Sequence, residues 1–281
     1  MSIAQPSTTD AARAIAAAAR PRRFGAWYVA LHRLRVMRSY GGTILASSIG
    51  SPIIYLYVLG VGLAGLIDAN LGDESIDGVG YLVFVAPALL ASAAITAAAE
   101  EFTYPVMVGY KWNPTFSGIA SSPIRPPQIV GGLVISVALR MALTCVLYFL
   151  LMLAFGAVPS PTGVLMLPAV VLTGMAFGAV LMAYSSTIEE DTGQLSIVMR
   201  VVVLPMTLFS GTFFPLAQLP LAVQWIGWIS PLWHGAQLAR IASFGYSEPL
   251  WLTLVHVLYL LGMLAAGWII SRRIAARRLN S

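Results

Sequence analysis

The sequence predicts an all-α integral membrane protein with six transmembrane helices, and its composition is the first observation behind that prediction. Of its 281 residues, 58% are hydrophobic and only 10% are charged, and the mean hydropathy is +0.83. Soluble domains carry roughly 25% charged residues because water must solvate their surface. We therefore expect most of this surface to face lipid.

The second observation is a series of apolar stretches, each close to the about 20 residues that cross a bilayer as a helix. They occupy residues 43–67, 81–99 with an extension to about 108, 129–155, 164–188, 195–214 and 251–270. We group them into one transmembrane domain over residues 41–271. An even number of spans places the two termini on the same side of the membrane.

The third observation is a set of basic flanks, because seven arginines precede the first apolar stretch and four follow the last. Basic residues gather on the cytoplasmic side of membrane proteins, so both termini are expected in the cytoplasm of a bacterium, with the chain in its plasma (inner) membrane. Residues 1–23 are expected to be a flexible N-terminus without a cleavable signal, since they lack a continuous apolar core. Residues 272–281 are expected to be a basic tail. A nucleic-acid-binding arm is disfavoured, because aromatic rings for base stacking are missing from the C-terminal run.

Residues 24–40 are predicted to form an amphipathic helix on the membrane surface. Trp27 and Tyr28 lie on its apolar stripe, whereas Arg33 and Arg35 fall largely off it. Such a helix places aromatic rings at the headgroup level and guanidinium groups toward phosphate. The alternative is a soluble helix on a core, but the chain offers no soluble domain to pack against.

Residues 215–245 are apolar and aromatic, but prolines 215, 220 and 231 interrupt them. A lipid-exposed span cannot leave backbone groups unpaired. Two short re-entrant half-helices at the outer interface, anchored by tryptophans, therefore fit better than a seventh span. A seventh span would also put the C-terminal arginines outside.

Three residues inside the apolar stretches are interpreted as packing residues. Cys145 is the one cysteine of the sequence, so it forms no internal disulfide. Gly174 and Gly178 form a G-x-x-x-G pattern, which is typical of close contacts between membrane helices.

The sequence gives little support for catalysis. It has no G-x-x-x-x-G-K-[ST] phosphate-binding loop, and its three histidines are scattered. Glu189, Glu190 and Asp191 are the most enzyme-like group, since a membrane transferase uses such acids to hold magnesium and diphosphate. That chemistry needs a second acidic cluster, which we do not find, so a solvated turn is favoured. We expect no metal or cofactor on this chain.

Four charged residues inside or beside the spans are predicted to form a buried network: Glu100, Glu101, Arg140 and Arg200. Arg140 lies deep in its span, so it should face protein or a water-filled cavity rather than lipid. Arg200 is shallower, and either snorkels to the surface or pairs with one of the glutamates. An ion pair that fixes helix packing and a contact with substrate are both open at this point.

The connection at residues 110–127 is long and rich in proline. Residues 113–120 are predicted to form a short helix with Asn113 as its cap and Pro114 at the first helical position. A rigid, proline-bounded segment beneath the membrane suits a docking surface for a partner. The alternative is a plain connector.

Several short strings are the most specific features of the chain after Phe24. They are Thr115-Phe116, Ser122-Pro123-Ile124-Arg125-Pro126, Phe209-Ser210-Gly211-Thr212-Phe213-Phe214-Pro215, Leu219-Pro220, Ser230-Pro231-Leu232 and Arg240. With these strings the chain resembles the permeases of the ABC-2 type transporter family, in the subgroup of nodulation-factor and daunorubicin exporter permeases.

That resemblance implies a transport subunit that moves an amphiphile, such as a drug, a lipid or a glycolipid. Two permease copies, or two related ones, would surround a central route, and separate ABC ATPase subunits would hold Mg-ATP. Family members often carry an acidic residue at the position of Ser117, so one ATPase contact is expected to differ here. The segment coupled to the ATPase would be Thr115, Phe116, Ser117, Gly118, Ile119 and Ala120. The extracellular gate would include Phe213, Phe214, Pro215, Pro220 and Pro231.

Three other classes of protein remain as alternatives. An ion-driven secondary transporter would use Glu100, Glu101 and Arg140, but such folds usually show broken helices in both halves, and we see one broken region. A membrane-embedded transferase depends on the acids at 189–191 binding magnesium. A non-transporting membrane scaffold is disfavoured by the family resemblance alone.

Overall fold

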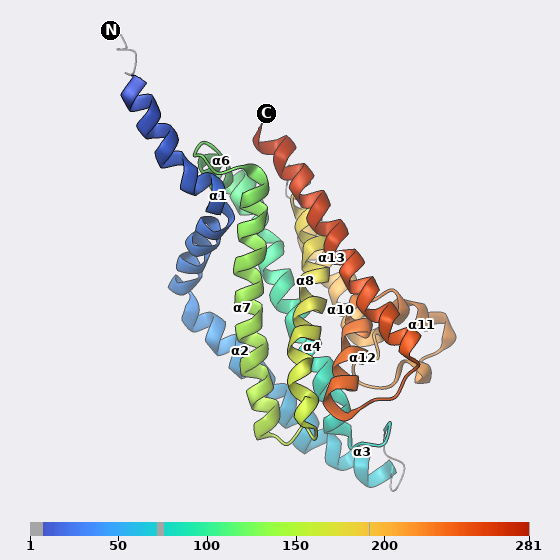
Figure 1. Ribbon diagram of the computed structural model, residues 1–281. Helices are drawn as coiled ribbons and strands as arrows, with labels where there is room; N and C mark the ends of the chain where they lie inside the picture. Colours follow the sequence, from blue (N-terminus) through green and yellow to red (C-terminus); the bar gives the residue numbers. More distant parts are fainter. Residues whose placement is uncertain (1–7, 72–75, 191, 281) are drawn as a thin grey trace.

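The apolar stretches form long helices. A computed structural model of the chain describes residues 8–71, 76–190 and 192–280. Within these residues the only strand-like pairing is an isolated bridge between Ile76 and Val79, so the predicted all-α class is confirmed (Figure 1). The helices are α1 (Thr8–Ser39), α2 (Gly41–Tyr57), η1 (Val58–Leu63), α3 (Ala64–Leu71), α4 (Tyr81–Phe102), α5 (Tyr104–Met107), η2 (Val108–Trp112), α6 (Thr115–Ala120), α7 (Pro126–Ala154), η3 (Pro161–Leu165), α8 (Met166–Ser185), α9 (Gln194–Ile197), η4 (Val198–Val203), α10 (Leu204–Phe209), η5 (Leu216–Gln218), α11 (Leu221–Trp228), α12 (Pro231–Phe244) and α13 (Leu250–Leu279).

Among the described residues, five helical stretches are long and apolar enough to cross a membrane. They are Gly41–Ile67, Tyr81–Trp112, Pro126–Ala154, Pro161–Ser185 and Leu250–Leu279. They agree with five of the six predicted spans. The remaining prediction, residues 195–214, corresponds to a shorter apolar helix at Gln194–Phe209.

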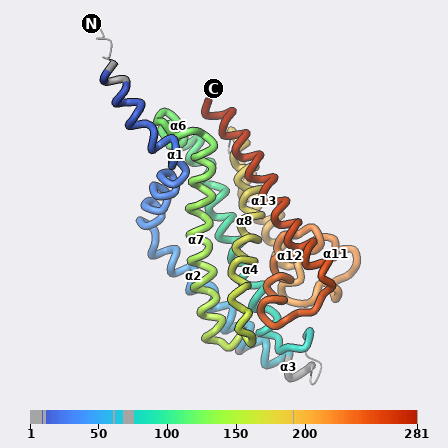
Figure 2. Tube along the Cα trace, in the orientation of Figure 1, coloured from blue at the N-terminus to red at the C-terminus, as the bar shows by residue number. Residues whose placement is uncertain are grey.

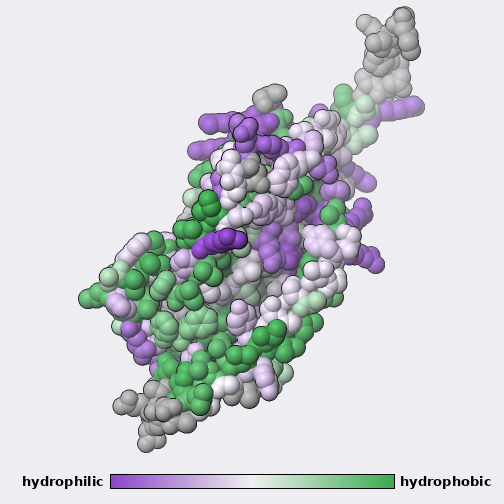
Figure 3. Space-filling model, turned by 180° about the vertical axis from the view of Figure 1, so that it is seen from behind, coloured by the Kyte–Doolittle hydropathy of each residue, from purple (hydrophilic) through white to green (hydrophobic). Residues whose placement is uncertain are grey.

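Helix α4 lies at the centre of the bundle. It packs against α8, α12 and α7, while α8 also contacts α13, and α1 lies along α7. Both chain ends lie at the end of the molecule that carries α6, called the terminal end below, and α3 lies at the opposite end (Figures 1 and 2). Hydrophilic residues gather toward the terminal end, and hydrophobic ones cover most of the remaining surface in view (Figure 3).

The G-x-x-x-G pattern in α8 marks a close helix contact, as predicted. A Cβ on Gly174 would lie 2.7 Å from the carbonyl oxygen of Ala94 on α4, and a Cβ on Gly178 would lie 2.5 Å from the ring of Phe102. Such distances are shorter than van der Waals contact, so only glycine allows α8 to approach α4 this closely.

Several element ends differ from their predictions. Helix α1 extends back to Thr8 and bends at Phe24, where φ and ψ leave the helical region, so residues 8–23 are helical rather than irregular. Residues 1–7 lie outside the described part. Helix α13 continues to Leu279, so the basic residues expected in a separate tail form its last turns. The short helix begins at Thr115, and Pro114 precedes it without a side-chain cap. Asn113 instead ends η2.

Candidate functional site

Four charged side chains from three helices form an ion-pair network. Glu101 on α4 accepts a hydrogen bond from Arg33 of α1 at 2.8 Å and a second one from Arg140 of α7. The other terminal nitrogen of Arg140 donates to Glu100 at 2.9 Å. The network contains two arginines and two glutamates, so its formal charges cancel.

Burial differs sharply across this network. The side chain of Glu101 is 3% exposed and that of Arg140 10%, whereas that of Glu100 is 50% exposed. A buried carboxylate is tolerated only when it is paired, and Glu101 has two guanidinium partners. Burial, followed by the charge of Glu101, raises the pKa of the nearby Tyr40 hydroxyl. The network therefore ties α1, α4 and α7 together.

Arg200 does not join this network. It lies in η4 and is exposed, and within the described residues it forms no ion pair. The neighbouring Met199 and Val203 of the same segment line a cavity with Glu100 and Arg140, whereas Arg200 is not among the residues that line it. Arg33 is instead the second arginine of the network. It was not predicted as a member from the sequence.

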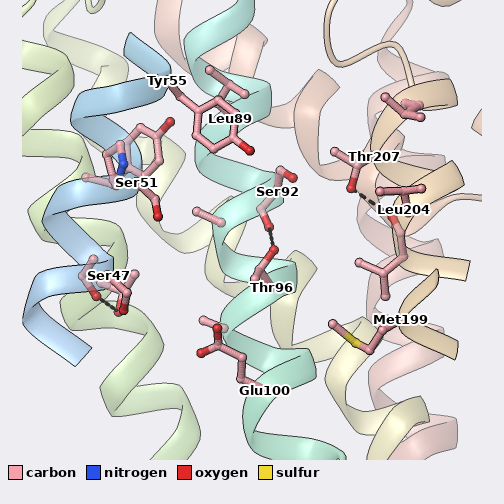
Figure 4. Close-up of a pocket in the computed structure, with 18 of the residues that line it drawn as sticks. Ser47, Ser51, Tyr55, Leu89, Ser92, Thr96, Glu100, Met199, Leu204 and Thr207 are labelled. Atoms are coloured by element: carbon pink, nitrogen blue, oxygen red, sulfur yellow. Dashed lines mark hydrogen bonds between the residues drawn. The ribbon is translucent and has the colours of Figure 1, made fainter. Parts of the chain in front are cut away.

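A cavity of about 510 Å³ lies between α2, α4, α7 and the segment η4–α10, and we call it the central cavity. Figure 4 shows side chains of α2 and α4 facing each other across it, with Met199, Leu204 and Thr207 on a further wall. Its walls are mostly apolar. Glu100 and Arg140 are its two charged lining residues.

Polar side chains enter the central cavity in three regular rows. Within each row the residues are four positions apart and so share one helix face. The rows are Ser47, Ser51 and Tyr55 on α2, Ser92, Thr96 and Glu100 on α4, and Arg140, Thr144 and Tyr148 on α7. These rows were not predicted from the sequence, although the four-residue spacing of hydroxyls within apolar spans would have indicated them.

The short helix α6 is held at the terminal end by Phe116. Its ring is buried and packs so closely on η2 that a Cβ at Gly109 would lie 2.3 Å from it. The ring of Tyr110 meets it edge-on, with centroids 4.9 Å apart. Thr115, Ser117 and Gly118 are exposed, while Ile119 and Ala120 are half-buried. A cavity of about 290 Å³, lined by Arg33 and Phe116 among others, separates α6 from α1.

At the terminal end, two further basic residues bind the turn that follows α8. Arg278 of α13 donates to the carbonyl oxygens of Ser186 and Ile188 and lies 4.6 Å from the ring centre of Tyr110. Lys111 donates to the carbonyl oxygen of Glu189 at 2.6 Å. The turn after α8 is therefore fixed against η2 and α13.

The acids considered for magnesium lie in this turn. The side chains of Glu189 and Glu190 are exposed, and Asp191 lies outside the described residues. Elsewhere in the described part of the chain, no group of three histidine, cysteine, aspartate or glutamate side chains is placed to hold a metal ion.

Two short helices, α11 and α12, occupy the proline-interrupted region. Pro220 precedes α11 and Pro231 is the first residue of α12, so the prolines sit where a missing N–H costs no hydrogen bond. Phe213 lines the central cavity. The next two residues of the chain, Phe214 and Pro215, are half-buried.

Arg240 of α12 forms hydrogen bonds with the segment around Gly211, which precedes α11 and α12. Arg240 is 2% exposed, and its guanidinium donates to the carbonyl oxygens of Gly211 at 2.7 Å and Phe84 at 3.3 Å. It also lies 3.8 Å from the ring centre of Phe84. The residues just before Phe213 are thus anchored to α4.

The three histidines are scattered in the sequence, but two of them are in contact in the structure. His234 of α12 and His256 of α13 are buried and in contact, and His256 also meets Glu248 at 3.2 Å. His32 remains apart, in the groove between α1 and α6. The buried pair joins α12 to α13.

Taken with the fold, the central cavity and the absence of a phosphate-binding loop in the sequence define an integral membrane protein that has no P-loop motif and has a mostly apolar cavity with rows of polar side chains. The model of the ABC-2 type transporter family matches residues 27–244. The chain therefore belongs to the ABC-2 type transporter family, whose members are the membrane subunits of transporters that have their ATPase in separate subunits.

Curated relatives agree with this assignment. The chain is 27% identical over 238 residues to nodulation protein J of Rhizobium leguminosarum bv. viciae, covering 84% of this chain and 88% of the relative. It is 28% identical over 204 residues to nodulation protein J of Rhizobium meliloti (strain 1021), covering 72% and 75%. The Rhizobium leguminosarum bv. trifolii protein of the same name is 29% identical over 205 residues, covering 72% and 76%.

Proposed function

We propose that this chain is the permease subunit of an ATP-driven exporter that moves an amphiphilic substrate, such as a drug, a lipid or a glycolipid, out of the cytoplasm or the inner leaflet. The observation that carries the proposal is the central cavity, because it combines apolar walls with rows of polar groups inside the membrane-spanning region. An amphiphile needs both kinds of surface.

In this proposal both termini are cytoplasmic and two copies of the chain, or two related chains, enclose the route. Residues 194–214 complete a sixth span. Residues 24–39 of α1 lie along the cytoplasmic interface, which is supported by the exposed rings of Trp27 and Tyr28. Helices α11 and α12 are re-entrant and cap the route on the outer side.

ATP binding would close the partner ATPases and move α6. Phe116 would transmit that movement to η2. Narrowing of the cavity that separates α6 from α1 would bring α6 toward Arg33, which lines that cavity. From Arg33 the ion pairs run through Glu101 to Arg140 and Glu100 at the central cavity. The two permeases would then rock between inward-facing and outward-facing states.

The first experiment is a detergent pull-down of the tagged chain from its native membrane, with ATPase activity measured in the eluate. We expect an ABC ATPase to copurify. Ser117→Arg on the exposed face of α6 should remove it, whereas Gln218→Arg, an exposed change in η5, should not. If the wild-type chain elutes without ATPase activity, the proposal fails and an ion-driven transporter using Glu100, Glu101 and Arg140 takes its place.

Coupling is tested with Arg33→Gln in the assembled complex. We expect ATP hydrolysis to continue while transport falls, because the variant breaks the contact between α1 and Glu101. The exposed Arg35 offers a matched control, since Arg35→Gln should preserve both activities. Equal transport by the two variants would exclude the ion-pair route.

A further inference from the structure

The chemical character of the central cavity restricts what it can bind. Its two charged lining residues differ in availability, since the side chain of Glu100 is 50% exposed and that of Arg140 only 10%. Both terminal nitrogens of Arg140 are already bonded to glutamates, and its Nε is buried without a partner. The guanidinium therefore presents little surface to an anion.

Glu100, in contrast, has one carboxylate oxygen that is available to accept a hydrogen bond from a ligand. Its Oε2 accepts from Arg140 at 2.9 Å, and within the described residues its Oε1 has no hydrogen-bond partner. A half-exposed carboxylate oxygen at a cavity wall attracts a cation or an N–H donor.

The hydroxyls around Glu100 have the same preference. Thr96 donates to the carbonyl oxygen of Ser92, Thr207 to that of Val203, and Ser47 to that of Ile44. Each hydroxyl has a single proton, and in these three it is already used by the residue's own helix. These three groups therefore present lone pairs and accept hydrogen bonds rather than donate them.

A further polar group lies farther along α7. Tyr148 lines the cavity, and its hydroxyl is buried without a partner, although buried polar groups are normally satisfied. Tyr148 is eight residues from Arg140, which is about 12 Å along a helix. A ligand that extends from Glu100 to the part of the cavity lined by Tyr148 is therefore elongated.

We propose that the central cavity binds an elongated amphiphile that carries a protonated amine, and that this amine lies against the Glu100 carboxylate, with Thr96 as a further acceptor. The inference rests on the proposed transport function and specifies its substrate class. The exposed carboxylate, the three hydroxyls whose protons are already used and the enclosed arginine all favour a cationic donor over an anion.

The test uses the chain alone in lipid nanodiscs, without ATP or ATPase. Two dansyl probes share one C12 chain and end in a primary amine or in a sulfonate, and the signal of empty nanodiscs is subtracted. We expect the amine probe to bind at least tenfold more tightly than the sulfonate probe. Glu100→Gln should weaken the amine probe about tenfold and leave the sulfonate probe unchanged, while Glu190→Gln, in the exposed turn after α8, should change neither. Equal binding of the two probes, or full amine binding by Glu100→Gln, would overturn the proposal.

A second pair of variants protects the test against a folding defect in Glu100→Gln. Thr96 is exposed in the cavity one helical turn from Glu100, so Thr96→Lys supplies a tethered ammonium group and should block the amine probe. Thr96→Gln has a similar length without charge and should block it much less. Equal effects of lysine and glutamine would show a steric block and contradict the role of the carboxylate. A failure here leaves ATPase copurification and transport untouched, so it is distinct from a failure of the proposed function.

Discussion

The Nδ1 atoms of His234 and His256 lie 2.6 Å apart in the buried contact between α12 and α13. The other nitrogen of each ring faces an acceptor, namely the carbonyl oxygen of Trp228 for His234 and the carboxylate of Glu248 for His256. If both outer nitrogens carry protons and both rings are neutral, two lone pairs meet at the centre. One additional proton between the rings removes that conflict, and Glu248 supplies its counter-charge.

Glu248 is therefore predicted to stabilise the contact between α12 and α13. Glu248→Leu removes the counter-charge and an acceptor that also bonds Thr253, so the variant should lose about 3–5 kcal/mol, as for one partner of a buried pair. Thermal unfolding in detergent measures the loss. The double variant Glu248→Leu with His256→Leu should lose less than the sum of the single variants. Additive losses would exclude the shared proton.

Acid is predicted to destabilise the same contact through His234. Burial, followed by the nearby His256, lowers the pKa of His234 to about 4, below its unfolded value of about 6.5. The unfolded chain then binds this proton more tightly, so stability falls as pH drops from about 6.5 to about 4, by at most about 1.4 kcal/mol per pH unit. His234→Gln should flatten the fall of the unfolding temperature across this window. An unchanged slope would contradict a neutral His234.

The stability of the fold is predicted to depend on the guanidinium group of Arg240 and not only on its positive charge. Arg240→Lys keeps the charge but cannot reach the carbonyl oxygens of Gly211 and Phe84 together, so it should lose about 2 kcal/mol of stability. Arg273→Lys, at an exposed position of α13, is the matched control and should be neutral. If Arg240→Lys unfolds at the wild-type temperature, the segment before Phe213 is held by other contacts.

The approach of α8 to α4 is predicted to depend on Gly174. Gly174→Ala places a methyl group 2.7 Å from the backbone oxygen of Ala94, which cannot rotate away, so the helices must separate and stability should fall by about 1–3 kcal/mol. Gly262→Ala on α13 meets nothing within 4 Å and should be neutral or stabilising. Equal unfolding temperatures for both variants would show that the bundle adjusts without cost.

Much of the fold was predictable because it depends on local properties. Five spans and the broken region at 215–245 follow from apolar length and from proline positions, and each acts within its own segment. The segment at 194–209 was harder, because its apolar stretch runs on to Phe214 in the sequence, while the helix ends at Phe209. Ser210 there bonds Ser230, a contact between residues 20 positions apart.

The candidate site was predictable only in part. Glu100, Glu101 and Arg140 stand out as charges in apolar surroundings, but their choice of partner depends on how each helix is rotated. Arg33 reaches Glu101 across 68 positions of sequence, whereas Arg200 forms no ion pair among the described residues although its neighbours line the cavity. Nothing in the local pattern separates those two arginines.

By itself, the sequence determined that this chain is a helical membrane protein, because hydrophobic length and backbone hydrogen bonding act within each segment. Its resemblance to the ABC-2 type transporter family rests instead on short sequence strings such as Phe209–Pro215. The tertiary structure alone decided which polar side chains share a cavity and which charges meet. The physical reason is that a buried charge or hydroxyl is stabilised by partners on other helices, and only packing brings those partners within hydrogen-bonding distance.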